Sequence, residues 1–242
     1  FKRLLDSGVD LKLEEKVDGS QFSFGFVEVL RKGAEGELEV VPEQSELKLR
    51  SKGAVMYPEA PRKMFQSAVD TVRDLAPKLK SGWTYRAEVL SKPKHNALAY
   101  DRVPKGNIII FDINTGGQEY LSYDEKAKEC ERLGLEVVPR LFEGRLRSAD
   151  EFRRFLESIS ILGGQKIEGV VIKPKAYDLY GTDKKVIFGK FVSENFKEVH
   201  RHAWGDELED VVQDHPDHAS AGRSQGDPYR NLPGAGRDHQ PD

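Results

Sequence analysis

The residues with the clearest chemical potential form the sequence Lys-x-Asp-Gly at positions 16–19. Lys16 ends a strand-like stretch next to a tight Asp-Gly turn, where its amine can point into a groove between sheets. Burial and neighbouring cations would lower the pKa of such an amine and free it to attack phosphorus. Gly19 would let the backbone approach a ligand closely. The competing interpretation is an ordinary exposed hairpin turn, in which these residue types are common.

Charged residues also accompany two later apolar stretches. Glu168 and Lys173 lie at the two ends of one stretch, and in a regular strand they would point to opposite faces, so both need not serve one site. Lys190 lies in the next strand-like stretch, where a lysine that faces inward could neutralise a phosphate. The alternative for each of these residues is a solvated charge at a sheet edge.

The elements expected to position these residues are mostly strands. A hairpin at the Asp-Gly turn is predicted to join strands 11–15 and 21–30, and further strands are predicted at 38–41, 47–50, 83–90, 107–113, 135–142, 167–173 and 185–192. Helices are predicted at 62–79, at 122–133 and from a capping box at Ser148 and Glu151 to about residue 160. This irregular order predicts an α+β fold of largely antiparallel sheets flanked by helices.

Composition excludes several classes of protein. The chain has 242 residues, 38% of them hydrophobic, which suits one large domain or two small ones and argues against wholesale disorder. No apolar run approaches the roughly 18–20 residues of a membrane span, so no membrane partner is expected. The single cysteine, Cys130, excludes an intramolecular disulfide and a cysteine-based zinc cluster, and it suits a reducing compartment, so we expect a cytoplasmic protein.

The order of the motifs resembles that of the covalent nucleotidyltransferases, which comprise ATP-dependent DNA ligases, RNA ligases and messenger-RNA capping enzymes. The motifs are Lys-x-Asp-Gly at 16–19, Phe-Asp-Ile at 111–113, Glu-Gly-x-Val-x-Lys at 168–173 and a last lysine strand at 190–192. Residues 85–104 resemble the RNA ligase branch typified by RNA ligase 2 of bacteriophage T4. The resemblance covers about residues 10–200.

The resemblance implies an adenylyltransferase domain with an ATP-grasp-like α+β fold, which we place at residues 1–204. It also implies a three-step reaction with ATP and Mg²⁺ or Mn²⁺. A lysine attacks the α-phosphate of ATP, the AMP passes to a 5′-phosphate end, and a 3′-hydroxyl then displaces the AMP. The implied partner is RNA or an RNA-containing nicked duplex, and we expect a monomer.

Carried over residue by residue, the resemblance assigns roles to eight positions. Lys16 matches the nucleophile, Glu168 the acid tied to metal-assisted chemistry, and Lys190 the lysine beside the α-phosphate. The other matches are nucleotide contacts: Glu15 near the adenine edge, Arg50 at the sugar and phosphate end, Glu88 on a ribose hydroxyl, Phe111 stacked on adenine, and Lys173.

The last motif departs from the pattern of the phage enzyme, which has two lysines two residues apart on one strand face. Here Lys190 is followed at that offset by Val192, which cannot donate a hydrogen bond to phosphate. Either Lys185, Lys173 or Lys197 substitutes, or this branch works with one lysine there. A DNA ligase core, a messenger-RNA capping core and a non-catalytic RNA-binding module are the alternative functions.

The net charge of −3 averages two unlike parts of the chain. Residues 205–242 hold nine acidic residues and three arginines, a net charge of −6, and they are rich in Gly, Pro, Asp, Ser and His. We expect this acidic tail to be disordered. Residues 1–204 then carry a net charge of +3, which suits local binding of phosphates and a modest, salt-sensitive affinity for RNA.

Overall fold

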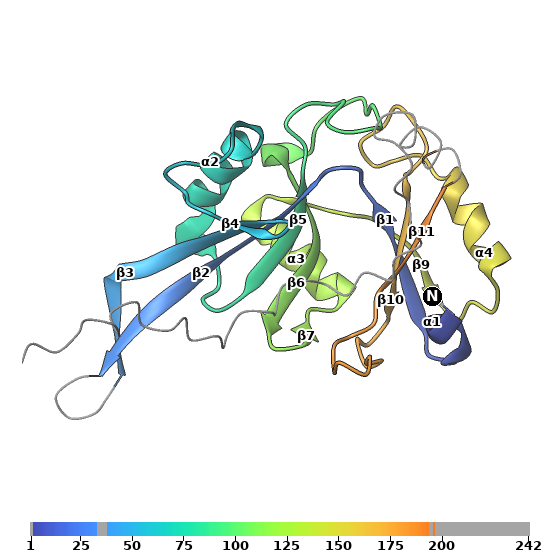
Figure 1. Cartoon of the computed structure of the whole chain (residues 1–242), viewed down its shortest axis with the longest axis horizontal. Helices are drawn as coiled ribbons and strands as arrows, with labels where there is room; N and C mark the ends of the chain where they lie inside the picture. The colour runs from blue at the N-terminus through green and yellow to red at the C-terminus, as the bar shows by residue number, and fades with distance from the viewer. Residues whose placement is uncertain (1, 33–37, 194–195, 197–242) are drawn as a thin grey trace, which may run out of the picture.

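The computed structural model describes residues 2–32, 38–193 and 196. Two β-sheets lie side by side, with the helices around them (Figure 1). The expected α+β fold of largely antiparallel sheets is therefore confirmed. The predicted domain boundary at residue 204 and the predicted tail at 205–242 lie outside the described residues.

The elements follow one another in an irregular order. The strands are β1 (Leu11–Lys16), β2 (Ser20–Lys32), β3 (Leu38–Ser51), β4 (Ala54–Met56), β5 (Thr84–Val89), β6 (Ile108–Gly116), β7 (Glu119–Tyr120), β8 (Glu136–Val137), β9 (Arg140–Gly144), β10 (Gly169–Pro174) and β11 (Gly189–Val192). The α-helices are α1 (Lys2–Asp6), α2 (Gln66–Leu75), α3 (Tyr123–Leu133) and α4 (Ala149–Arg153). Short 3₁₀ turns are η1 (Lys63–Phe65), η2 (Ala76–Lys78), η3 (Lys105–Asn107) and η4 (Arg154–Glu157).

The larger sheet has seven strands in the order β4-β3-β2-β5-β6-β7, with β8 added in parallel to β6. Strands β2 and β3 form a long hairpin that projects from the body of the molecule (Figure 1). The prediction of two short strands at 38–41 and 47–50 is wrong, because β3 is continuous. The residues between them form an irregularity opposite Val27 and Val29, where the pairing register shifts, and they do not end the strand.

The smaller sheet has the order β11-β10-β1-β9, so β1 and β2 do not form the predicted hairpin. Strand β1 pairs with β9 and β10, and the chain then crosses to the other sheet at residues 17–19. Asp18 causes this crossing, because its carboxylate accepts hydrogen bonds from the backbone N–H groups of Ala97 and Leu98, at 2.8 Å each. The hydroxyl of Tyr100 accepts a third bond, from the Asp18 N–H at 2.8 Å. A local turn signal is thus overridden by contacts with a distant loop.

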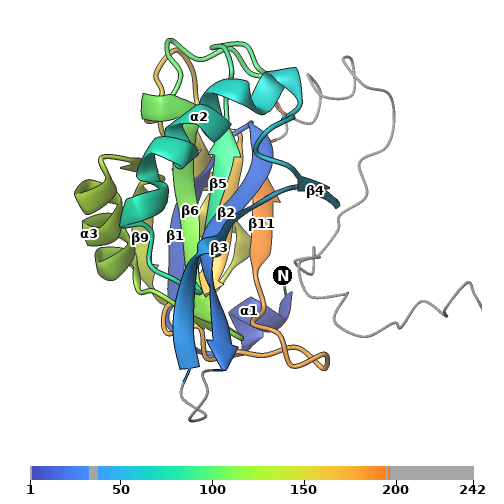
Figure 2. The ribbon, with the colours of Figure 1, turned by 90° about the vertical axis from the view of Figure 1, so that its left-hand side faces the viewer.

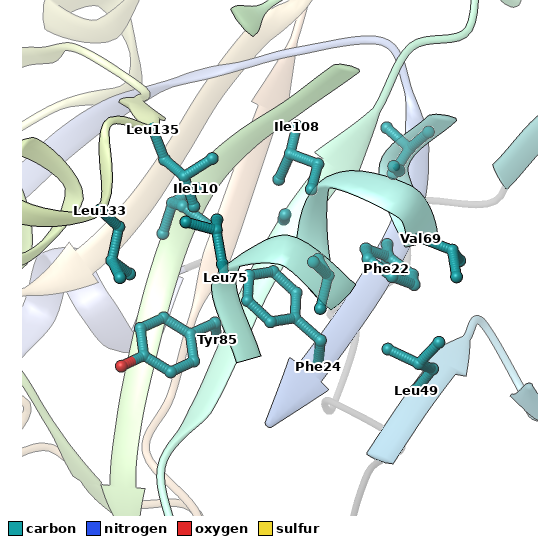
Figure 3. Packing of buried hydrophobic residues seen from close by; sticks show 14 of the residues in the cluster. Phe22, Phe24, Leu49, Val69, Leu75, Tyr85, Ile108, Ile110, Leu133 and Leu135 are labelled. Atoms are coloured by element: carbon teal, nitrogen blue, oxygen red, sulfur yellow. The ribbon is translucent and has the colours of Figure 1, made fainter. Parts of the chain in front are cut away.

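Each sheet has its own hydrophobic core on its outer face. The larger sheet packs Phe22, Phe24 and Tyr85 against Val69 and Leu75 of α2, as Figure 3 shows. The smaller sheet buries Leu11, Leu13 and Ile172 in a second cluster that also contains Leu4 of α1 and Phe152 of α4. Figure 2 shows the molecule from the side, with α3 and α2 covering the larger sheet. The faces that the two sheets turn toward each other carry charged side chains such as Lys16 and Glu88 beside apolar ones such as Phe111 and Val171.

The helix predictions are confirmed in part. Helix α2 with its 3₁₀ flanks covers the predicted 62–79. Helix α3 starts at a true capping box between Ser122 and Glu125 and stops at Gly134, whose φ of 69° suits glycine. The capping box predicted at Ser148 is wrong, since the Ser148 side chain makes no capping bond and α4 passes after five residues into a 3₁₀ turn.

Two predicted strands are shorter than expected. The stretch 135–142 is interrupted, because β8 pairs with the larger sheet and β9 with the smaller one. In the stretch 185–192 only β11 is a strand. Among the described residues, no helix is both long enough and apolar enough to span a membrane.

Candidate active site

A cavity of about 360 Å³ lies between the two sheets, within the size range of small-molecule sites. Its walls come from strands of both sheets and from the crossing between β1 and β2. The lining residues are Glu15, Lys16, Val17, Gln21, Lys52, Glu88, Phe111, Asp112, Val138, Val171, Phe188, Gly189 and Lys190. Five of the eight positions assigned from the sequence are among them: Glu15, Lys16, Glu88, Phe111 and Lys190.

Lys16 reaches the cavity because side chains alternate along β1. Leu11 and Leu13 point to the outer core, and Lys16 points inward at the end of the strand, with 27% of its side chain exposed. Its Nζ lies 2.7 Å and 2.8 Å from the two carboxylate oxygens of Glu168. Glu168 directly precedes β10, whose first residue, Gly169, pairs with Lys16. The ion pair is thus fixed by the register of two adjacent strands.

The pKa of Lys16 is raised, so the predicted lowering is wrong. Burial disfavours the charged amine, but the carboxylates of Glu168 and Glu88 outweigh it and hold the proton on Nζ. Burial likewise raises the pKa of Glu168, against the opposing effect of Lys16. The raised pKa favours the ammonium form of Lys16, and an attack by this amine requires that the proton leave.

Gly19 brings the crossing close to Glu88. A Cβ at position 19 would lie 2.9 Å from the Glu88 Cβ and 3.0 Å from the Val89 carbonyl oxygen, so only glycine fits without a shift. Burial raises the pKa of Glu88 to about 8, with further contributions from Glu168 and Asp18. The raised pKa shifts Glu88 toward its protonated form, in which it can both donate to and accept from a bound hydroxyl group.

A β-bulge in β6 places two consecutive residues in the cavity wall. Ala87 lies opposite Ile110 and Arg86 lies opposite Asp112, so Phe111 is the extra residue on its strand. Bulges of this kind re-aim side chains and are frequent beside active sites. Phe111 and Asp112 accordingly both line the cavity, whereas neighbours in a regular strand would face opposite sides. The ring of Phe111 offers a stacking face for an aromatic ligand.

Lys190 and Lys52 are the cations that line the cavity with Lys16. Lys190 lies opposite Val171 on β11, as expected for an inward-facing lysine. Sequence reasoning missed Lys52, an exposed residue just after β3, for which the only signal is its place two residues after Arg50. Val192 packs against a third hydrophobic cluster and lines a separate cavity, so it contributes no charge here.

Glu15, although it lines the cavity, and the assigned residues Arg50 and Lys173, which do not, are placed differently from what the sequence suggested. The carboxylate of Glu15 accepts hydrogen bonds from the Ser160 hydroxyl at 2.6 Å and from the Ile161 N–H at 3.0 Å, so it is held by residues that do not line the cavity. Arg50 is half-buried on β3. Neither Arg50 nor Lys173 is among the described residues that line the cavity.

Lys173 instead belongs to a buried charge cluster beneath the cavity floor. Its members are Lys12, Glu14, Asp112, Lys126 and Lys173, each with 1% or less of its surface exposed. Lys173 Nζ lies 2.7 Å from Glu14 and 2.9 Å from Asp112. Lys126 Nζ lies 2.8 Å from the same Glu14 oxygen. Lys173 and Glu168 therefore serve different places, but the predicted opposite faces are wrong, since Glu168 contacts Lys16 and Lys173 contacts Asp112 of the other sheet.

Lys185 does not take the place of the second lysine in the cavity lining. Lys185 pairs with Asp183 at 3.5 Å, and Lys197 lies outside the described residues. Lys52 is therefore the third cation of the cavity, in a position that the sequence comparison of the last motif did not suggest.

Comparisons with known proteins identify the family and the fold. A sequence model of the RNA ligase family matches residues 10–192. The RNA ligase of Naegleria gruberi with pyrophosphate is 17% identical, with a TM-score of 0.58 over 83% of this chain and 55% of that one. One mutant of that ligase with ATP and manganese and another with AMP and manganese are each 16% identical over 83% of this chain and, respectively, 55% and 56% of theirs, with TM-scores of 0.58 and 0.57. This likeness establishes the fold, and the chain spans about half the length of these ligases. No curated protein sequence matches the chain.

Proposed function

We propose, since the chain belongs to the RNA ligase family, that it is an ATP-dependent RNA ligase whose nucleophile is Lys16. The observation that carries the proposal is the Lys16–Glu168 ion pair at the wall of a cavity that also presents Phe111 and Lys190. An amine, a stacking ring and phosphate-neutralising cations are the groups that transfer of an adenylyl group from ATP requires.

In the first step, the neutral Lys16 amine attacks the α-phosphorus of ATP. A P–N bond forms, the P–O bond to pyrophosphate breaks, and the proton of Nζ must leave. Glu168 is placed to take that proton, because its oxygens lie 2.7 Å and 2.8 Å from Nζ and burial raises its pKa. Lys190 and Lys52 would neutralise the phosphates, and Phe111 would stack on the base.

The next two steps transfer the adenylyl group and then remove it. An RNA 5′-phosphate attacks the lysyl-adenylate, so the P–N bond breaks and a phosphoanhydride forms. A 3′-hydroxyl then attacks the 5′-phosphorus, the phosphodiester forms and AMP leaves. Positioning and charge neutralisation dominate such phosphoryl transfers, which matches a site built from fixed cations on strands.

A divalent metal ion fits the site only together with the nucleotide. Within the described part of the chain, no group of three or more His, Cys, Asp or Glu side chains could hold a metal ion. Mg²⁺ is usually held by one or two carboxylates plus substrate phosphates, and Glu168, with 4% of its side chain exposed, is a suitable carboxylate. When bound, Mg²⁺ or Mn²⁺ would neutralise charge on the phosphates.

We further propose that the chain belongs to the branch typified by RNA ligase 2 of bacteriophage T4. The support is the loop at residues 91–100, whose sequence resembles that branch and which packs on the crossing. Asn96 donates to the Gly19 carbonyl at 2.7 Å, and the His95 Nε2 lies 2.9 Å from the Ser20 hydroxyl oxygen. A cytoplasmic location and a monomeric state stay predictions.

A sealing assay tests the proposed function and its substrate class. Nicked duplexes that differ only in RNA or DNA at the 3′-hydroxyl and 5′-phosphate strands are incubated with ATP and Mg²⁺. We expect sealing when the 3′-hydroxyl strand is RNA and not when ATP is omitted. Better sealing of an all-DNA nick, or protein labelling only with GTP, would instead identify a DNA ligase or a capping enzyme.

A further inference from the structure

We propose that Lys126 of α3, which belongs to none of the sequence motifs, is a positioning residue that aims the ring of Phe111 at the adenine base. The inference rests on the proposed function, because it takes the face of Phe111 to be the adenine site. Lys126 is fully buried, and its Nζ donates a hydrogen bond to the Phe111 carbonyl oxygen at 2.6 Å. It therefore contacts the backbone of a residue whose side chain lines the cavity.

The bulge in β6 makes the aim of this ring depend on contacts outside the sheet. Phe111 is the extra residue between Ile110 and Asp112, and an extra residue bends its strand away from the regular ladder. Two ammonium groups meet at its carbonyl oxygen: Lys126 from α3 at 2.6 Å and Lys173 from β10 at 2.8 Å. Charge-assisted hydrogen bonds of this kind are among the strongest in proteins, so they fix the orientation of the peptide group.

Glu14 bridges the two lysines. Its Oε2 accepts from Lys126 at 2.8 Å and from Lys173 at 2.7 Å, which offsets the repulsion between the two ammonium groups. Asp112 gives Lys173 a further acceptor at 2.9 Å and also accepts from the Tyr177 hydroxyl at 2.8 Å. The Phe111 carbonyl is thus held from helix α3 and from β10 of the smaller sheet at once.

A purely structural role explains Lys126 poorly. On the buried side of α3, Cys130 and Leu133 are apolar and belong to the core of the larger sheet, and the buried Glu129 pairs with Arg132 at 2.6 Å near the surface, whereas Lys126 reaches inward. An apolar residue at position 126 would fill similar space without removing a charge from water, which is costly. The hydrogen bond to the Phe111 carbonyl, in the cavity wall, gives a reason for a buried charge at Lys126.

The test compares Lys126→Met with Lys128→Met, a matched control because Lys128 is exposed on the same helix. Self-adenylylation is measured over a range of ATP concentrations, and pyrophosphate-driven release of AMP is measured over a range of pyrophosphate concentrations. For Lys126→Met we expect the half-saturating ATP concentration to rise about tenfold, with little change in the maximal rate. The half-saturating pyrophosphate concentration should stay unchanged, because pyrophosphate has no base to stack.

Each outcome decides between the two proposals. If the unmodified protein forms no adenylate, the proposed function fails. If it forms adenylate and Lys126→Met behaves like Lys128→Met, only the positioning role fails. The same holds if Lys126→Met raises the half-saturating concentrations of ATP and of pyrophosphate together. Circular dichroism checks folding. If Lys126→Met does not fold, Lys126→Arg is read out instead. Because Lys126→Arg retains the charge, its half-saturating ATP concentration should rise only about threefold. An unchanged half-saturating ATP concentration would overturn the inference.

Discussion

Two lysines on the inner face of β1, four residues apart, occupy opposite environments. Lys16 at the open end is 27% exposed and paired with Glu168, and its pKa is raised. Lys12 at the closed end is buried, and its Nζ lies 3.7 Å from the centre of the Tyr177 ring without a hydrogen-bond partner among the described residues. Burial and then Lys173 lower the pKa of Lys12 to about 7.

The difference teaches that burial alone does not decide the charge of a lysine. Both amines lose solvent, but Lys16 has a carboxylate in direct contact, whereas Glu14 is shared by Lys126 and Lys173 and helps Lys12 only at longer range. The same strand therefore favours an ammonium at the end that lines the cavity and holds the proton of Lys12 only weakly at its buried end. The following experiments challenge this contrast.

The largest effect is expected from the acid that pairs with Lys16. Glu168→Gln removes the proton acceptor and the carboxylate for a metal, so self-adenylylation should fall about a hundredfold or more. Labelling with α-labelled ATP measures the rate. Glu157→Gln is the matched control, because Glu157 is exposed and remote from the cavity lining. An unchanged rate in Glu168→Gln would remove Glu168 from the chemistry.

A smaller loss is expected for the cation that the motifs did not reveal. Lys52→Ala removes one of the three lysines that line the cavity and should slow self-adenylylation about tenfold, through one lost charge-assisted phosphate contact. Lys48→Ala is the control, since Lys48 is exposed on the same strand and pairs with Glu46. Equal rates in the two variants would show that Lys190 suffices alone.

Lys12, at the other end of β1, is expected to make the stability of the protein depend on pH. The pKa of Lys12 is about 7 in the folded protein and near 10.5 when unfolded, so between these values the unfolded chain binds more protons and stability rises with pH. Between pH 6.5 and 8.5, the unmodified protein should gain about 2 kcal/mol relative to Lys12→Met, as urea unfolding would measure. Parallel pH dependence of the two proteins would contradict the lowered pKa.

The smallest effect concerns the helix that carries Lys126. Ser122→Ala removes the capping box of α3 and should lower the free energy of unfolding by about 1 kcal/mol. Ser148→Ala, at the start of α4, should cost close to nothing because the Ser148 side chain makes no capping bond. Urea unfolding of both variants gives the comparison, and equal losses would speak against the assigned difference between the two helix starts.

Local sequence patterns predicted the residues around Lys16, at the cavity end of β1, better than those around Lys12, at its buried end. The motif order identified Lys16, Glu88, Phe111 and Lys190, all of which meet at one cavity. Alternation along a strand is enough to place such residues on an inward face. The hairpin at residues 17–19 was predicted wrongly, because Asp18 is captured by a loop about eighty residues later in the chain.

The buried charge cluster could not be predicted from local patterns. Lys126 lies in a helix rich in charged residues, and only the packing of α3 on both sheets shows that it is buried. The raised pKa of Lys16 depends on a strand register between residues more than 150 positions apart. Lys52 lines the cavity through the long β2–β3 pairing, which the sequence divided into two short strands.

The most direct test of the account maps the adenylyl group on the protein. The chain is incubated with ATP and Mg²⁺, digested and analysed by mass spectrometry, alongside Lys16→Ala and Lys12→Met. We predict one adenylyl group on Lys16 in the unmodified protein, none in Lys16→Ala, and a retained group in Lys12→Met. An adenylyl group on another residue, or one that persists in Lys16→Ala, would contradict the assignment of Lys16 as the nucleophile.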